Sequence, residues 1–224
     1  LVREGMREGY PTISAVDGKP LSGALILPRP SPKTFLRRDG STITVPEPPN
    51  EYALKAEPTT PFSGGPLTPT GDPLVDGVGP AAWAQRPDVP DRNHKGEPRM
   101  RPISFDNHFY LAEEDTDPRG LPVRTYDNEI AGTVTDVWVD RAEYLLRYLS
   151  VETPAGVKLL PINMSIISGQ DKEVRVRSVT ADQMTRVPAT KADDQVTMLE
   201  EDMIQAYYAG GTLYSNTART EPLL

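Results

Sequence analysis

The alternation of apolar and polar residues is clearest in the middle of the chain, where it predicts strands joined by short turns. A short apolar piece at 121–123 is followed by a polar turn at 126–129 and a β-branched run at 130–139. A second apolar run occupies residues 145–151. The charged residues 140–144 between these two runs have hairpin length. We therefore expect a small β domain to be built around this hairpin.

The same kind of pattern continues towards the end of the chain. Short strands are predicted at 157–161 and 173–179, the second with a clean period of two. Capping boxes at 180–183 and 197–200 each predict the start of a helix. The second of these helices is expected to stop at Gly210 and Gly211, because glycine commonly ends a helix.

The first half of the chain has a different character. A hairpin is predicted at 33–45, with Asp39 and Gly40 in its turn. Residues 46–80 contain nine prolines, which are too many to sustain a helix or a central strand. This segment still carries large apolar residues, so we expect an extended strap lying on a partner's surface. The aromatic-rich stretch at 102–110 is predicted to be a strand.

Composition divides the chain near residue 110. Residues 1–110 hold 18 of the 24 prolines and equal numbers of basic and acidic residues, 13 each. Residues 111–224 hold 11 basic and 19 acidic residues, which accounts for the net charge of −8. We predict a mainly β protein, with a small antiparallel barrel and one or two C-terminal helices at 111–224. An extended, proline-rich region at 1–110 precedes it.

Several classes of function lack their usual signatures. The chain has no cysteine and two scattered histidines, which excludes thiolate metal sites and does not favour any other metal cluster. The negative charge argues against nucleic-acid binding. Nucleotide-binding glycine loops, serine-hydrolase elbows and zinc-protease motifs are missing. No apolar run is long enough to span a bilayer. Residues 1–11 are compatible with a solvated terminus or a juxtamembrane segment.

The charged hairpin carries the first candidate chemistry. Asp140 and Glu143 lie at its corner, and Arg147 follows on the next strand. Adjacent carboxylates are common at solvated corners, and they are also the residues of a glycosidase pair. A third interpretation is proton relay through bound water, with Arg147 tuning the carboxylates. Sequence alone leaves these alternatives open.

A second candidate site lies in the polar loop around His94. This histidine has Asp91, Lys95 and Glu97 as neighbours, so it is either an exposed loop residue or part of a proton-collecting patch. His108, among aromatic residues, is expected to be packed and hydrogen-bonded. The acidic run 200–202 is attributed to helix capping and to the helix dipole.

A series of short segments gives the chain a specific resemblance to a known family. It resembles the H subunit of the purple-bacterial type photosynthetic reaction centre, and its second half resembles the barrel domain named after that complex. The matching segments are MREGYP at 6–11, PKTF at 32–35, PTGDPLVDGVGPAAW at 69–83, DPRGLPV at 117–123, AGTVTDVWVD at 131–140, RYL at 147–149, LLP at 159–161, VTMLEED at 196–202 and YYAGGTLY at 207–214.

The resemblance implies an accessory, non-enzymatic subunit of a light-driven quinone-reducing complex in the bacterial inner (intracytoplasmic) membrane. It would cap the cytoplasmic face of the L and M subunits, with membrane lipids and antenna subunits as further candidate partners and no nucleic acid. The chain would bind no cofactor directly; the partner subunits would carry bacteriochlorophyll, bacteriopheophytin, quinones and non-haem iron. The family's single transmembrane helix would directly precede residues 6–11, and residues 1–110 would be a membrane-proximal region packing on the partner subunits.

The resemblance also implies roles for individual residues. The relay glutamate of the family's WVD-x-x-E corner falls on Glu143, the aspartate on Asp140 and the following arginine on Arg147. The proton-uptake patch falls on residues 91–97, with Asp91, His94 and Glu97 as its candidates. Two rival hypotheses remain at this point. One is a soluble barrel-type adaptor that binds another protein, and the other is an acid–base hydrolase that uses the corner carboxylates.

Overall fold

The chain folds into two compact units, residues 1–68 and 69–224. The computed structural model describes residues 32–45, 53–61, 65–106 and 108–216. The predictions for residues 1–11, and those for parts of the strap, lie outside the described residues.

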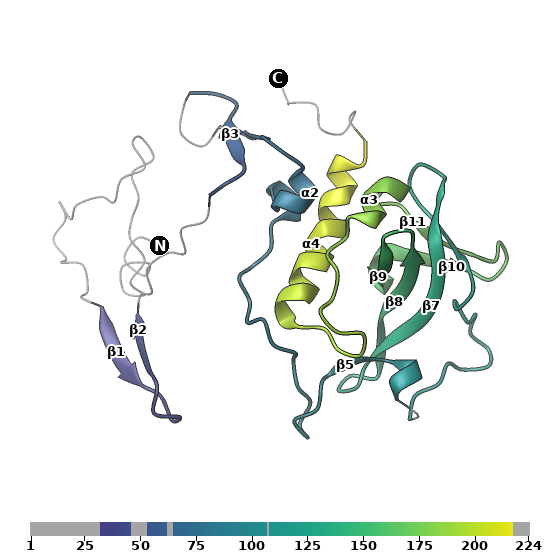
Figure 1. The fold of residues 1–224 in the computed structure, drawn as a ribbon, viewed down its shortest axis with the longest axis horizontal. Helices are drawn as coiled ribbons and strands as arrows, with labels where there is room; N and C mark the ends of the chain where they lie inside the picture. The colour runs from purple at the N-terminus through teal and green to yellow at the C-terminus, as the bar shows by residue number, and fades with distance from the viewer. Residues whose placement is uncertain (1–31, 46–52, 62–64, 107, 217–224) are drawn as a thin grey trace. The chain divides into compact units, whose positions relative to one another are not determined.

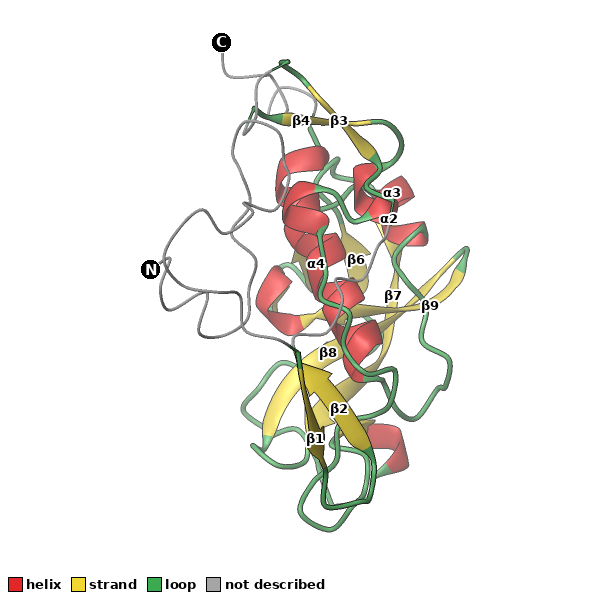
Figure 2. Ribbon diagram, turned by 90° about the vertical axis from the view of Figure 1, so that its left-hand side faces the viewer, coloured by secondary structure: helices red, strands yellow, loops and turns green. Residues whose placement is uncertain are grey.

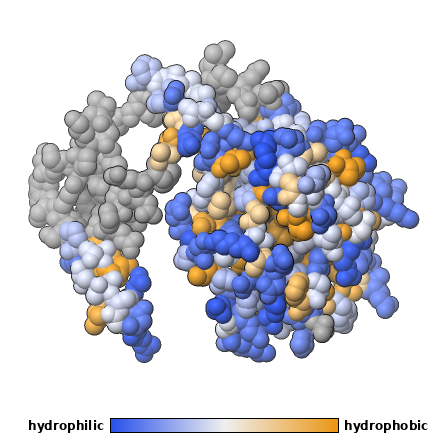
Figure 3. Space-filling view, in the orientation of Figure 1, coloured by the Kyte–Doolittle hydropathy of each residue, from blue (hydrophilic) through white to orange (hydrophobic). Residues whose placement is uncertain are grey.

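The first unit contains the predicted hairpin. Strands β1 (Lys33–Leu36) and β2 (Thr42–Val45) pair antiparallel, and Gly40 takes the positive φ of 83° that the turn requires. A second pair is formed by β3 (Ala56–Pro58) and β4 (Leu67–Pro69). Both faces of the hairpin lie at the surface, and Figure 3 shows its apolar side chains there.

The second unit is built on a seven-stranded sheet (Figure 1). Its main path runs β10-β11-β6-β7-β8-β9, and β5 pairs with β7. All neighbours are antiparallel except β11 and β6, which are parallel. The strands are β5 (Met100–Pro102), β6 (Pro122–Arg124), β7 (Ile130–Asp140), β8 (Leu145–Thr153), β9 (Gly156–Pro161), β10 (Ser165–Ser168) and β11 (Glu173–Val176).

Short helices and one long helix complete this unit. Both predicted capping boxes are present, at Thr180 and Thr197, and they open α3 and α4. Helix α4 lies over one side of the sheet, beside α2 (Figure 1; Figure 2). The helices are α2 (Pro73–Asp76), η1 (Gly79–Ala81), η2 (Ile103–Phe105), η3 (Ile162–Met164), α3 (Ala181–Thr185) and α4 (Met198–Tyr214).

The prediction that Gly210 and Gly211 end the last helix is wrong. Helix α4 continues through both glycines to Tyr214. A Cβ at Gly210 would lie 2.5 Å from the Cβ of Ala81, and one at Gly211 would lie 2.2 Å from the carbonyl oxygen of Ser178. The glycines therefore allow close packing between α4 and its neighbours, and they do not break the helix.

The interpretation of residues 46–80 as a helix-free strap on a partner is also wrong in part. Asp72 caps the short helix α2 by accepting a hydrogen bond from the Leu74 backbone, and Pro73 occupies its first turn, where proline is tolerated. The side chains of Leu74 and Val78 are buried, and α2 packs on α4. This part of the segment is therefore anchored within its own unit.

Two further expectations differ from the structure. Only the start of 102–110 is strand, because η2 follows β5 directly. Strand β10 carries no clear alternation and was not expected. The face predicted for 173–179 is confirmed, since Val174, Val176 and Ser178 are buried while Arg175 and Arg177 are exposed.

The core of the second unit lies between the sheet and α4. Trp138, Leu149 and Leu160 from the sheet and Ile204 and Tyr208 from α4 are almost completely buried. Among the described residues, no helix combines the length and the apolar character needed to cross a bilayer.

Gly211→Ala should destabilise the protein, by about 1–3 kcal/mol. Alanine would gain about 1 kcal/mol of helix propensity, but its Cβ would meet a backbone oxygen that cannot move without shifting the chain. Denaturant unfolding measures the difference. Thr212→Ala, at the neighbouring exposed position, is the control and should change stability by less than about 0.5 kcal/mol. A more stable Gly211→Ala protein would contradict the packing role.

Candidate functional site

The β7–β8 corner is organised by Asp140, the last residue of β7. Its Oδ1 atom accepts hydrogen bonds from the backbone N–H groups of Ala142 (2.9 Å) and Glu143 (3.1 Å). Its side chain is only 2% exposed, whereas that of Glu143 is 49% exposed. The corner thus places one carboxylate inside the protein and the other at its surface.

Arg99 joins these carboxylates from a distant part of the chain. It directly precedes β5, whose Met100 is paired with Asp140 on β7. Its Nε donates to both carboxylate oxygens of Asp140 at 2.9 and 3.0 Å, and its Nη2 lies 2.7 Å from Oδ2. The same Nη2 donates to Glu143 Oε1 at 2.6 Å, and Nη1 lies 3.4 Å from Asp91. One guanidinium therefore holds three carboxylates together.

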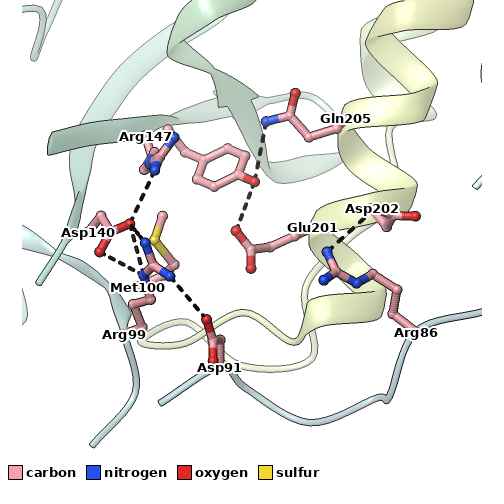
Figure 4. A pocket seen from close by; sticks show the side chains of 10 residues that line it. Arg86, Asp91, Arg99, Met100, Asp140, Arg147, Glu201, Asp202 and Gln205 are labelled. Carbon is pink, nitrogen blue, oxygen red and sulfur yellow. Dashed lines mark hydrogen bonds and ion pairs between the residues drawn. The ribbon is translucent and has the colours of Figure 1, made fainter. Parts of the chain in front are cut away.

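Arg147, on β8, contacts two of these carboxylates, those of Glu143 and Asp140. Its Nη2 donates to Glu143 Oε2 at 2.7 Å and lies 3.4 Å from Asp140 Oδ2. The structure thus brings together Asp140, Glu143 and Arg147, the three residues predicted for the relay. Figure 4 shows Arg147 and Arg99 on either side of Asp140.

Asp140, Arg99 and Arg147 line a cavity of about 320 Å³ whose far wall belongs to α4 (Figure 4). Glu201 projects from the helix towards Tyr148, whose hydroxyl donates to Glu201 Oε1 at 3.1 Å. Gln205, one turn further along α4, donates to the same hydroxyl oxygen at 3.4 Å. A polar cavity of this size has room for several water molecules. It can therefore connect the corner to Glu201 through water.

The carboxyls around the cavity differ in their electrostatics. Burial alone would raise the pKa of Asp140, but the hydrogen bonds from Arg99 and from two backbone N–H groups outweigh it and lower that pKa. Burial raises the pKa of Glu201 above its ordinary value, and the hydrogen bond from Tyr148 offsets this only partly. The ionised form of Asp140 is consequently favoured, whereas burial favours the protonated form of Glu201.

The predicted uptake residues are only partly brought together. Asp91 lines the cavity and contacts Arg99. Glu97 instead forms an ion pair with Arg141 at 3.0 Å, and the hydrogen bond from the Asn93 side chain and the charge of Arg141 lower its pKa. The His94 side chain is exposed, and its ring makes no hydrogen bond or ion pair with another residue that the structure describes.

His108 is not packed as expected. Its side chain is 88% exposed, although it does lie 3.0 Å from the Asp106 carboxylate. The neighbouring aromatic residues Phe109 and Tyr144 pack on each other. The expected hydrogen bond is therefore present without the expected burial.

The acidic run 200–202 has three different roles. Glu200 accepts from the Thr197 backbone N–H at 2.8 Å, which confirms the predicted cap. Asp202 accepts from the Ala84 backbone N–H at 2.7 Å. Glu201 faces the cavity, a role that capping does not explain and that sequence reasoning missed.

Arg99 was also missed, because its sequence neighbours carry no sign of a partner 41 residues away. The strand pairing of Met100 with Asp140 is the long-range signal that would have found it. In the part of the chain that the structure describes, no three histidine or acidic side chains are placed to hold a metal ion.

Comparison with known families accounts for most of the chain. Residues 1–105 match the photosynthetic reaction centre H-chain N-terminal region, and residues 112–183 match the PRC-barrel domain. The chain belongs to the reaction-centre H-chain family. The resemblance seen in the sequence and the mainly β, barrel-type fold are thereby confirmed, and the chain is a subunit of a photosynthetic reaction centre.

The cavity combines residues from both matched regions. Arg99 and Asp91 lie in the H-chain N-terminal match, while Asp140 and Arg147 lie in the PRC-barrel match. The two matches meet close to the predicted division at residue 110, whereas packing divides the chain between residues 68 and 69. The division into regions 1–110 and 111–224 remains a proposal. Residues 69–110, the end of the first region, belong to the same compact unit as the barrel.

Asp140→Asn should lower stability at neutral pH, by about 2–3 kcal/mol, because it leaves Arg99 without its main partner. The pKa of Asp140 is lower in the folded protein than in the unfolded chain, where it is about 3.9. Its ionised form therefore stabilises the folded state at pH values above about 3.9, and this contribution is lost as the pH falls through the pKa of the folded state. The difference in the free energy of unfolding between wild type and variant should therefore shrink and disappear as the pH is lowered below about 4. Unfolding measured at several pH values tests this, and an equal gap at every pH would contradict it.

Proposed function

We propose that this subunit caps the cytoplasmic face of the L and M subunits and stabilises the region of the quinones. Support comes from its membership of the H-chain family and from the absence of enzyme motifs in the sequence. The match over residues 1–105 also counts against an adaptor made of a barrel alone. Bacteriochlorophyll, bacteriopheophytin, quinones and non-haem iron would belong to the partner subunits.

We further propose that the β7–β8 corner relays protons to the secondary quinone during light-driven electron transfer. The observation that carries this proposal is the linkage of a buried carboxylate, Asp140, to a surface carboxylate, Glu143, by the shared arginine Arg99. Proton transfer needs donors and acceptors within hydrogen-bond reach of each other or of one bridging water. Arg99 itself stays protonated, so the linkage would fix the positions of the carboxylates while bridging waters carry the protons between Glu143 at the surface and the cavity beside Asp140.

Each residue of the corner would have a different role in proton transfer, set by its burial and its hydrogen bonds. Glu143 would exchange protons with water, while Asp140, held ionised, would supply a fixed negative charge that attracts them. Arg147 and Arg99 would tune both carboxylates. Glu201, whose pKa is raised by burial, would be a further proton-exchanging group on the far wall of the cavity. Protons would enter from the side of Asp91, with His94 and Glu97 as collecting groups on the adjoining loop.

Gentle detergent extraction of native membranes tests the capping role. Affinity capture of this chain should bring down two hydrophobic subunits together with near-infrared bacteriochlorophyll absorption. Intact masses would compare the length of the captured chain with the 224-residue sequence. A colourless preparation without those partners would overturn the capping role and favour a soluble adaptor.

Glu143→Gln tests the relay, because it removes a titratable group while preserving side-chain size. The proton-coupled second reduction of the secondary quinone should slow by roughly tenfold, which corresponds to ~1.4 kcal/mol in the barrier. Flash kinetics on the isolated complex across a range of pH measures this rate. The complex should assemble normally, since Glu143 is half exposed.

Glu152→Gln is a matched control for that experiment. Glu152 is an exposed glutamate on β8, outside the corner cavity. Its replacement removes the same charge and should leave the rate unchanged. Identical kinetics of the Glu143→Gln and wild-type complexes at every pH would rule out the relay and leave the capping role intact.

A further inference from the structure

A second hollow, of about 480 Å³, lies on the outer side of β6 and β11. It shares no lining residue with the cavity at the β7–β8 corner. Three arginines, Arg124, Arg175 and Arg177, line it without any carboxylate among the lining residues. This arrangement is unexpected in a chain whose net charge is −8.

The parallel pairing of β6 and β11 brings the arginines together. Arg124 and Arg175 are directly opposite each other in the register of these strands. Arg177 follows directly after the end of β11 and lines the same hollow as Arg175. The intervening Val176 is buried in the core, which fixes the arginine face outward.

A buried glutamate holds two of the three guanidinium groups in place. Glu173 is 6% exposed, and it accepts hydrogen bonds from the Nε of Arg124 at 2.8 Å and from the Nε of Arg175 at 2.5 Å. These hydrogen bonds, that from Arg124 first, lower the pKa of Glu173. Glu173 is contacted through the Nε of both arginines, which leaves their Nη groups for other acceptors.

Some of those outer nitrogens are already engaged. Arg124 Nη1 donates to the Asn128 carbonyl oxygen at 2.9 Å, and Arg175 Nη2 lies 3.1 Å from Asp171. The side chain of Arg177 makes no hydrogen bond or ion pair with another residue that the structure describes. Glu173 and Asp171 offset two of the three positive charges. One full positive charge and several N–H donors therefore face the hollow.

We propose that this hollow binds a phosphate monoester, with Arg177 as its main cationic contact. Guanidinium groups bind phosphate in a bidentate manner, and a phosphate monoester offers three acceptor oxygens and close to two negative charges. A carboxylate has only two acceptor oxygens, so it would leave donors of this three-arginine site unused. Tyr126, beside the arginines, gives the hollow a partly aromatic wall for the organic part of the ligand. The site goes beyond the proposed capping and relay functions.

The phosphate monoester could come from a soluble metabolite or from the headgroup of a lipid such as phosphatidic acid. The full chain should bind inorganic phosphate and glycerol 3-phosphate saturably in titration calorimetry, with sodium acetate of matched ionic strength as the reference. Arg177→Gln should weaken this binding about tenfold, because it removes a charge-assisted hydrogen-bond donor. Glu173 and its two partner arginines are left unchanged in this variant.

Lys172→Asn is the matched control. Lys172 is an exposed lysine in the β10–β11 turn that does not line the hollow, and its positive φ of 51° suits asparagine. This variant loses the same charge and should bind phosphate like the wild type. Equal weakening by both variants would show diffuse electrostatic attraction and overturn the site, as would phosphate binding that never saturates.

Cosedimentation with vesicles separates the two sources. Vesicles of phosphatidylcholine with phosphatidic acid should retain the wild-type chain and release Arg177→Gln if the ligand is a lipid. Binding of glycerol 3-phosphate in solution, without any effect of Arg177→Gln on cosedimentation, would assign the site to a soluble ester. Lack of an Arg177-dependent signal in both measurements would overturn the proposal.

Discussion

The ion pair between Asp140 and Arg99 is the interaction on which the rest of the second unit depends. A carboxylate that is 2% exposed would be strongly destabilising without partners, because ionised groups lose several kcal/mol of hydration on burial. Here it accepts hydrogen bonds from Arg99 and from two backbone N–H groups of its own turn. The pair thereby fixes the β7–β8 corner and joins β5 to the end of β7.

The same pair determines what the neighbouring groups can do. A carboxylate with so many donors is stabilised in its ionised form, so it is a poor proton carrier and an effective fixed charge. Groups with fewer donors at the margin of the cavity are better suited to exchange protons. Glu143 is half exposed, and Glu201 is partly buried with a raised pKa. We therefore propose that Glu143 and Glu201, and not the Asp140–Arg99 ion pair, exchange the protons.

Local patterns predicted those parts of the fold that local interactions determine. The strand alternation located β7, β8 and β9, and both capping boxes are present, because each depends on residues within a few positions. The hairpin corner likewise brought Asp140, Glu143 and Arg147 together. Arg99, Glu201 and the buried glycines of α4 were missed because their roles depend on partners more than 30 residues away. Tertiary packing overrode the usual helix-ending preference of Gly210 and Gly211.

The two arginine clusters differ in how fully they are neutralised, and this difference separates their proposed roles. Arg99 contacts three carboxylates, so its positive charge is neutralised within the protein. Its effect is limited to the pKa values of those neighbours. Arg177 contacts none among the described residues, although its neighbours Arg124 and Arg175 are held by Glu173. An exposed cation beside two oriented guanidinium groups retains its attraction for an external anion. In an acidic chain, such a local excess of positive charge gives selectivity for anions at one place while the remaining surface repels them.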